Sequence, residues 1–92
     1  MKKVYYYIGS NNETHKLEKT KIEQILATHF EEFTAFEILD YWKGLKEKTL
    51  KIKAITELAD SQLASIDKEL KIKLKQENVL MDIVHSNCAF IQ

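Results

Sequence analysis

Apolar residues in this chain repeat with two different periods, and the order of these periods limits the possible folds. Alternating stretches rich in β-branched and aromatic residues predict strands at residues 3–8, 33–43, 46–56 and 79–84. Stripes with helical spacing predict two helices, at residues 17–30 and 59–76. The order of elements is therefore βαββαβ, the split-βαβ arrangement of an α+β fold. A chain of 92 residues is expected to form a single domain, residues 1–92.

The right-handedness of βαβ connections determines how these elements pack. It predicts a ferredoxin-like domain, in which two helices cover one face of a four-stranded antiparallel sheet with the first and third strands at its centre. Counting by twos predicts six core positions that point towards the helices: Val4, Tyr6, Ile8, Leu50, Ile52 and Ala54. The open face then carries Thr49 and four residues with apolar rings or stems: Tyr5, Tyr7, Lys51 and Lys53. Because a small domain can hardly leave this surface in water, these four residues are predicted to form a homo-oligomer interface.

The helical stripes predict which residues of the helices are buried. In the first helix the stripe consists of Ile22, Ile25, Leu26 and His29. In the second helix it consists of Ala59, Leu63, Ile66, Leu70 and Leu74. Asp67 is expected on the polar flank of this second stripe, and Ile72 lies off it.

The predicted strand at residues 33–43 does not alternate cleanly. Its apolar side chains are Phe36, Ile38, Leu39, Tyr41 and Trp42, and these cannot all point to one face of a regular strand. The sequence therefore predicts a β-bulge in this strand.

Charge and composition argue against several classes of partner. Fourteen basic residues balance fourteen acidic ones, so no net field attracts nucleic acid or anionic lipid. Every basic residue is a lysine, and the absence of arginine disfavours sequence-specific DNA recognition. RNA-recognition domains of this topology stack bases on aromatic residues of both central strands, but here the second central strand offers Lys51 and Lys53. Sequence-specific binding of nucleic acid is therefore not expected.

Membrane spans, metals and cofactors are not expected either. No stretch approaches the ~18 uncharged residues of a bilayer-spanning helix. The single cysteine, Cys88, cannot form an intramolecular disulfide, which favours a reducing compartment and a cytoplasmic location. The histidines His15, His29 and His85 have no metal-ligand spacing, and no glycine-rich phosphate loop is present. We expect no bound metal and no cofactor.

Four segments resemble small uncharacterised ferredoxin-like proteins of bacteria and their phages. They are YIG at residues 7–9, FTAFE at 33–37, YWKG at 41–44 and EKTLKI at 47–52. Because these segments are strand ends, the resemblance implies the fold and carries over no site residue. It also implies a phage-type protein that interferes with a host process, for example in an anti-defence role.

A ligand site is predicted at the turn that joins the second and third strands. Aromatic rings of Tyr41 and Trp42 offer stacking area, and Lys43 offers a point charge for phosphate or carboxylate. Possible neighbours are His15 and the loop residues Ser10, Asn11 and Asn12, which lead towards a helix N-terminus where anions are favoured. Two alternatives stay open: Trp42 can be a core or interface anchor, and the loop can be a turn that caps the helix.

Three classes of function are compatible with these observations. The first is a non-enzymatic binding module, a homo-oligomer that sequesters a small anionic ligand such as a nucleotide-derived signal, or that masks a host protein. The alternative is a small oligomeric enzyme with an inter-subunit pocket, using His15, His85 or a strand carboxylate for acid–base chemistry. The available carboxylates are Glu37, Asp40, Glu47 and Asp82. The third class is a nucleic-acid accessory protein. No motif fixes a catalytic pair, so the binding module is favoured.

Overall fold

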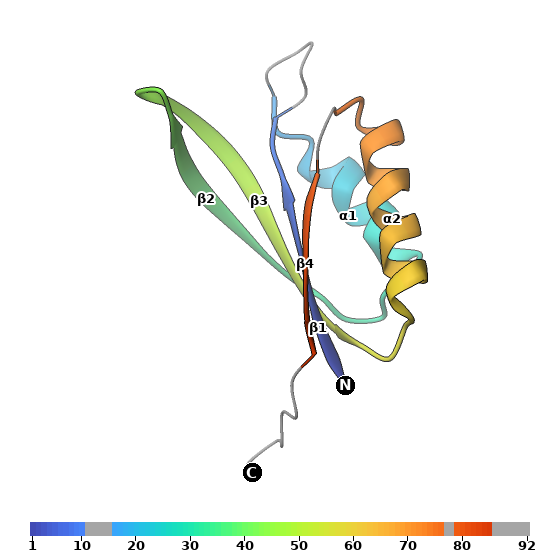
Figure 1. Ribbon diagram of the computed structural model, residues 1–92. Helices are drawn as coiled ribbons and strands as arrows, with labels where there is room; N and C mark the ends of the chain where they lie inside the picture. Colours follow the sequence, from blue (N-terminus) through green and yellow to red (C-terminus); the bar gives the residue numbers. More distant parts are fainter. Residues whose placement is uncertain (11–15, 77–78, 86–92) are drawn as a thin grey trace.

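The fold is a single sheet covered on one side by helices (Figure 1). The computed structural model describes residues 1–10, 16–76 and 79–85, and of Trp42 only the backbone. Its elements are β1 (Lys2–Ile8), α1 (Lys19–Ala27), β2 (Thr34–Trp42), β3 (Leu45–Thr56), α2 (Asp60–Lys73) and β4 (Leu80–His85). The four strands are antiparallel neighbours in the order β2-β3-β1-β4. The predicted ferredoxin-like α+β fold is confirmed.

The core lies between the helices and the central strands, because every second side chain of β1 and β3 points towards the helices. Their register runs from Lys2 opposite Thr56 to Ile8 opposite Leu50. All six positions predicted to point towards the helices are buried. The residues between them, including Tyr5, Tyr7, Lys51 and Lys53, therefore lie on the open face.

Helix α2 packs on the sheet with the predicted stripe. Leu63, Ile66, Leu70 and Leu74 are buried, whereas Ile72 is 69% exposed. Two predictions for this helix were wrong. Ala59 precedes the helix and is exposed, and Asp67 lies inside the stripe and is only 8% exposed. Asp67 is four residues from Leu63, so helical geometry turns it inward.

Asp67 affects the chemistry of the core beside it. One of its oxygens, Oδ2, lies 3.3 Å from Lys71 Nζ, one turn along the helix. The hydroxyl of Tyr6 donates a hydrogen bond of 2.9 Å to the carbonyl of Leu63. Burial of Tyr6, with the nearby charge of Asp67, raises the pKa of this phenol, which therefore remains a neutral donor.

Helix α1 is shorter than predicted, and this changes its last core contact. Ile22, Ile25 and Leu26 are buried as expected. His29 lies beyond the helix end and is not part of the stripe, contrary to the prediction; its Nε2 lies 2.6 Å from Glu69 Oε2 of α2. Phe30 is buried instead, and its ring centroid lies 6.4 Å from that of Tyr6.

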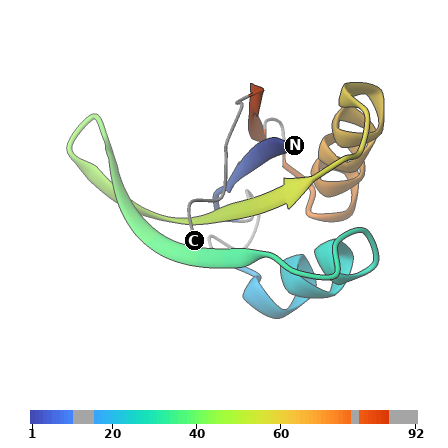
Figure 2. The same ribbon diagram turned by 90° about the horizontal axis from the view of Figure 1, so that it is seen from below.

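The β2–β3 hairpin extends well beyond the rest of the sheet. Pairing between β1 and β3 ends at Leu50, so residues 38–49 form a two-stranded arm with no third strand beside it. Figures 1 and 2 show the arm leaving the body on the side away from the helices. At its tip the connection is two residues long, and Lys43 and Gly44 have φ values of +48° and +80°. Such turns suit the twist of a hairpin.

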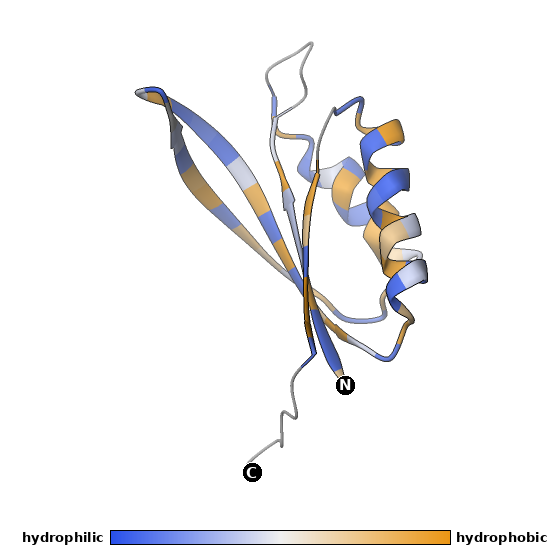
Figure 3. Ribbon diagram, in the orientation of Figure 1, coloured by the Kyte–Doolittle hydropathy of each residue, from blue (hydrophilic) through white to orange (hydrophobic). Residues whose placement is uncertain are grey.

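The predicted bulge in β2 is wrong. The β2–β3 register is continuous from Thr34 opposite Lys53 to Trp42 opposite Leu45. Apolar side chains of this strand point to both faces because no helix covers either face of the arm. Figure 3 shows both apolar and polar residues along each strand of the hairpin. In the arm, Leu39, Tyr41 and Leu45 are 56%, 65% and 69% exposed.

Candidate functional site: a mixed-charge pocket at the base of the arm

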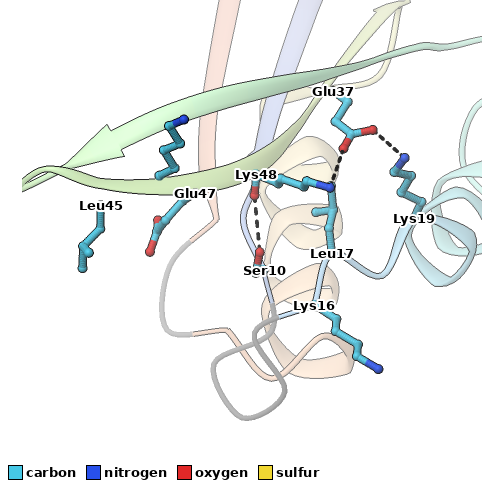
Figure 4. A pocket seen from close by; sticks show the side chains of 9 residues that line it. Ser10, Lys16, Leu17, Lys19, Glu37, Leu45, Glu47 and Lys48 are labelled. Atoms are coloured by element: carbon cyan, nitrogen blue, oxygen red, sulfur yellow. Dashed lines mark hydrogen bonds and ion pairs between the residues drawn. The ribbon is translucent and has the colours of Figure 1, made fainter.

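A cavity of about 640 Å³ lies where the arm separates from β1. One wall is β3 beyond the point where β1 stops covering its edge, and the other is the chain on either side of the β1–α1 connection (Figure 4). Its lining residues are Ser10, Lys16, Leu17, Lys19, Glu37, Leu45, Lys46, Glu47 and Lys48. We call this the arm pocket. Its volume lies within the range of small-molecule sites.

The wall formed by the end of β1 is held in place from two sides. The hydroxyl of Ser10 donates a 3.4 Å hydrogen bond to the carbonyl of Lys48 in the arm. The carbonyl of Gly9 accepts a hydrogen bond from the side-chain amide of Gln76, just beyond α2. The segment that leaves β1 therefore contacts both the arm and the C-terminal end of α2.

Glu37 forms ion pairs with two lysines of the pocket. Its Oε2 lies 2.5 Å from Lys19 Nζ of α1, and its Oε1 lies 3.7 Å from Lys48 Nζ of β3. The pKa of Glu37 is lowered, mainly by the hydrogen bond from Lys19, with the charges of Lys19 and Lys48 adding to the effect. Glu37 is therefore an anion at neutral pH and a weak proton acceptor.

The arm pocket carries both signs of charge. Four lysines face two glutamates, so the lining has a net positive charge. Glu47 takes part in none of the ion pairs among the described residues. Leu17 and Leu45 add apolar surface. This combination suits a small ligand that has an anionic group, a cationic group and an apolar part.

The structure separates the residues of the predicted ligand site. Ser10 lines the arm pocket, but Tyr41 and Lys43 lie at the other end of the arm and do not line it. Asn11, Asn12 and His15 lie outside the described residues, as does the side chain of Trp42.

Sequence reasoning missed the lysines of the pocket. Lys19 and Lys48 are separated by 29 positions, and no spacing motif links them to Glu37. The available signal was indirect: the predicted third strand is much longer than the predicted first strand. A long strand beside a short one leaves part of its edge uncovered, and the pocket lies along that part.

The groups proposed for acid–base chemistry are also dispersed. Only Glu37 and Glu47 line the arm pocket. Asp40 accepts a 2.8 Å hydrogen bond from Thr49 Oγ1 in the arm, and Asp82 lies on β4 opposite Tyr5. His85 is at the opposite end of β1, with Nε2 3.2 Å from Asp60 Oδ2.

The described part of the chain also bears on metal binding and on membrane crossing. No group of three or more histidine, cysteine, aspartate or glutamate side chains there could hold a metal ion. Neither α1 nor α2 has the length and apolar character needed to cross a membrane.

Fold and pocket together define a ferredoxin-like domain with an extended hairpin and a mixed-charge cavity at its base. No protein-family model matches the sequence, and no curated protein matches it. Among solved structures, a DUF3240 family protein from Shewanella baltica is similar over 99% of this chain and 96% of its own, with a TM-score of 0.62 and 14% identity. A phage SAM lyase in its apo state is similar over 90% of this chain and 78% of its own, with a TM-score of 0.59 and 16% identity. Both show the shared fold, in a bacterial and a phage protein.

Proposed function

We propose that the protein binds a nucleotide-derived small molecule in the arm pocket, and that this ligand is S-adenosylmethionine. The observation that carries the proposal is the mixed charge of the pocket, where Glu37 is fixed between Lys19 and Lys48. A purely anionic ligand such as a nucleoside triphosphate would pair with the lysines but would also meet two carboxylates that it cannot neutralise. A ligand with charges of both signs finds a counter-charge for each of them.

S-Adenosylmethionine has the chemical groups that the lining complements. Its carboxylate suits the lysines, and its ammonium and sulfonium groups suit Glu37 and Glu47. The ribose hydroxyls can exchange hydrogen bonds with Ser10, and Leu17 and Leu45 offer apolar contact to the adenine ring. The phage SAM lyase supports this choice because its fold is the same and its name states a reaction of this molecule.

Sequestration would connect the ligand with the phage-type role. S-Adenosylmethionine is a methyl donor, and a small protein that binds it lowers its free concentration. This would interfere with a host process that depends on methylation. The effect requires only tight binding and no catalysis.

The proposal is tested by calorimetric titration of the purified protein with S-adenosylmethionine. We expect saturable binding that Glu37→Gln and Lys48→Ala each weaken roughly tenfold, since each variant leaves one charge of the pocket without its counter-charge. Lys68→Ala, at an exposed position of α2, is the matched control and should bind as the wild type does.

Two other ligands separate the charge requirements. S-Adenosylhomocysteine lacks the sulfonium charge and should bind more weakly than S-adenosylmethionine. ATP should not displace bound S-adenosylmethionine. Equal binding of ATP, or unchanged affinity in a well-folded Glu37→Gln variant, would contradict the proposed site.

Cleavage of the same ligand is a second candidate function. The observation that favours it is the presence of two carboxylates in the pocket of a protein that shares its fold with a lyase. A sulfonium leaves as a neutral thioether, because the electron pair of the broken C–S bond goes to sulfur. Glu37, with its lowered pKa, would hold the sulfonium as a counter-ion. Glu47, which forms no described ion pair, would accept a proton from the carbon next to the one that leaves sulfur. The electrons of that C–H bond then form a C=C bond as the C–S bond breaks, which gives a neutral thioether and an unsaturated amino acid.

Chromatography distinguishes the two functions. Incubation of S-adenosylmethionine with stoichiometric and with catalytic protein is followed by analysis for an adenosine-containing thioether. Multiple turnovers, abolished in Glu47→Gln without loss of binding, would establish a lyase. Tight binding with no product would establish sequestration.

A further inference from the structure

The open face of the sheet has two ends of opposite charge. On the body, the open face presents Lys51 and Lys53 beside Tyr5 and Tyr7. The ammonium group of Lys51 lies 5.0 Å from the ring centroid of Tyr5 and 5.6 Å from that of Tyr7. Both tyrosines are half-buried, so part of each ring stays exposed and this end of the face is basic and aromatic.

On the arm, the same face is acidic. Asp40 and Glu47 are directly opposite each other in the β2–β3 register, and adjacent like charges on paired strands are unfavourable. Thr49 donates a hydrogen bond to Asp40, but a hydroxyl does not neutralise the charge. Among the described residues, none of the ion pairs includes Asp40, Glu47, Lys51 or Lys53. Within the described part of the chain, the charges at both ends of the open face therefore have no ion-pair partner.

The arm is also too apolar for a hairpin in water. A two-stranded hairpin without a third strand or a helix is only marginally stable alone. Leu39 and Tyr41 add exposed apolar surface on the face of the arm opposite to Asp40, and Phe36 and Leu80 add it on the open face of the body. In addition, β2 is an edge strand of nine residues, whose unpaired backbone groups favour association with another chain.

We propose that the arm of one copy lies across the open face of a second copy of this chain. The acidic pair Asp40 and Glu47 then lies near the lysines Lys51 and Lys53 of the neighbouring copy. In a two-fold symmetric pair each copy gives one arm to its partner and receives one, and this reciprocal contact closes the assembly.

The dimensions of the protein suit this assembly. A strand of twelve residues, the length of β3, spans about 40 Å, so the arm reaches beyond its own body. A stable interface takes about 800 Å² from each partner. That is a minor part of the 6536 Å² total surface of the chain, so the open face and arm can supply it. Glu47 is shared by the arm pocket and the acidic pair, but Asp40, Lys51 and Lys53 do not line the pocket, so variants at these three positions test the assembly separately from the proposed ligand.

Light scattering coupled to size-exclusion chromatography tests the proposal on the full chain. The wild type should form a closed assembly of two or more copies at micromolar concentration. Lys51→Glu combined with Lys53→Glu makes the whole face acidic and should weaken assembly roughly 100-fold, as expected when like charges meet at an interface. Adding Asp40→Lys to this pair restores an attractive contact and should recover at least about tenfold of the loss. The matched control is Lys21→Glu with Lys68→Glu, which changes the charge equally at exposed helix positions and should leave the assembly intact.

A second variant addresses folding. Phe36→Ser with Leu80→Ser changes only side chains of the open face that are exposed in the single chain, so it should fold normally and still assemble poorly. Circular dichroism verifies the fold of each variant. A monomeric wild type, an assembly unaffected by the charge reversal, or the absence of recovery on adding Asp40→Lys would each overturn the proposal. Titration with S-adenosylmethionine, run in parallel, reports on the pocket independently.

Discussion

Replacement of Leu70 by alanine should remove a large part of the stability of this domain. The side chain of Leu70 is 0% exposed and packs in the stripe of α2 that faces the sheet. Leu→Ala removes three carbon atoms from the core and leaves a cavity, and the two effects together cost about 3 kcal/mol. A domain of this size has a total free energy of unfolding of about 5–14 kcal/mol.

Ile72 provides the matched comparison within the same helix. It is 69% exposed, two positions along the chain, and Ile72→Ala should cost less than about 0.5 kcal/mol. The measurement is urea unfolding of both variants at one protein concentration, because assembly would otherwise add to the apparent stability. Equal losses for the two variants would refute the assignment of the buried helix face.

Three other perturbations have defined outcomes. Tyr6→Phe removes the buried hydrogen bond to the α2 backbone and should lower the unfolding free energy by about 1–2 kcal/mol in the same assay. Gly44→Ala places a side chain at φ +80° in the hairpin turn and should cost about 1 kcal/mol, with no further loss from steric contact because the space around Gly44 is open. The pKa values of Glu37, Asp60 and Glu69 are lowered by hydrogen bonds from lysines, so their contribution to stability is present above the unfolded carboxylate pKa values, near 4, and should be lost as the pH falls through the folded values. Thermal unfolding between pH 7 and pH 3 tests this; a melting temperature that stays constant, or rises, on acidification would contradict it.

The sheet and its core could be predicted from the sequence because they depend only on the spacing of apolar residues along the chain. Alternation in β1 and β3 assigns Tyr6 and Ile52 to the helix side whatever the details of packing. The stripe of α2 likewise follows from helical spacing, although that spacing also turned Asp67 inward against its polarity.

The arm and its pocket could not be predicted in this way. The alternation of side chains along a strand predicts the face on which each side chain lies, but not where the neighbouring strand ends. The bulge expected in β2 assumed that its apolar residues had a core to share, and beyond Leu50 no such core exists. His29 failed for a related reason, because helical spacing has no meaning after the helix has ended at Ala27. Glu37, Lys19 and Lys48 are brought together by three different elements, and only tertiary structure reveals this.

The central position of β1 has a consequence for how the chain folds. β1 is the first strand to be synthesised, yet its two neighbours are β3 and β4, so Lys2 pairs with Thr56 on one side and with His85 on the other. These contacts join residues far apart in the sequence, and such contact patterns slow folding because long loops must close before any pairing is gained. The apolar side chains of β1 therefore stay exposed until β3 and β4 have been synthesised and can pair with it. During this interval β1 exposes apolar surface and unpaired strand edges, which favour aggregation.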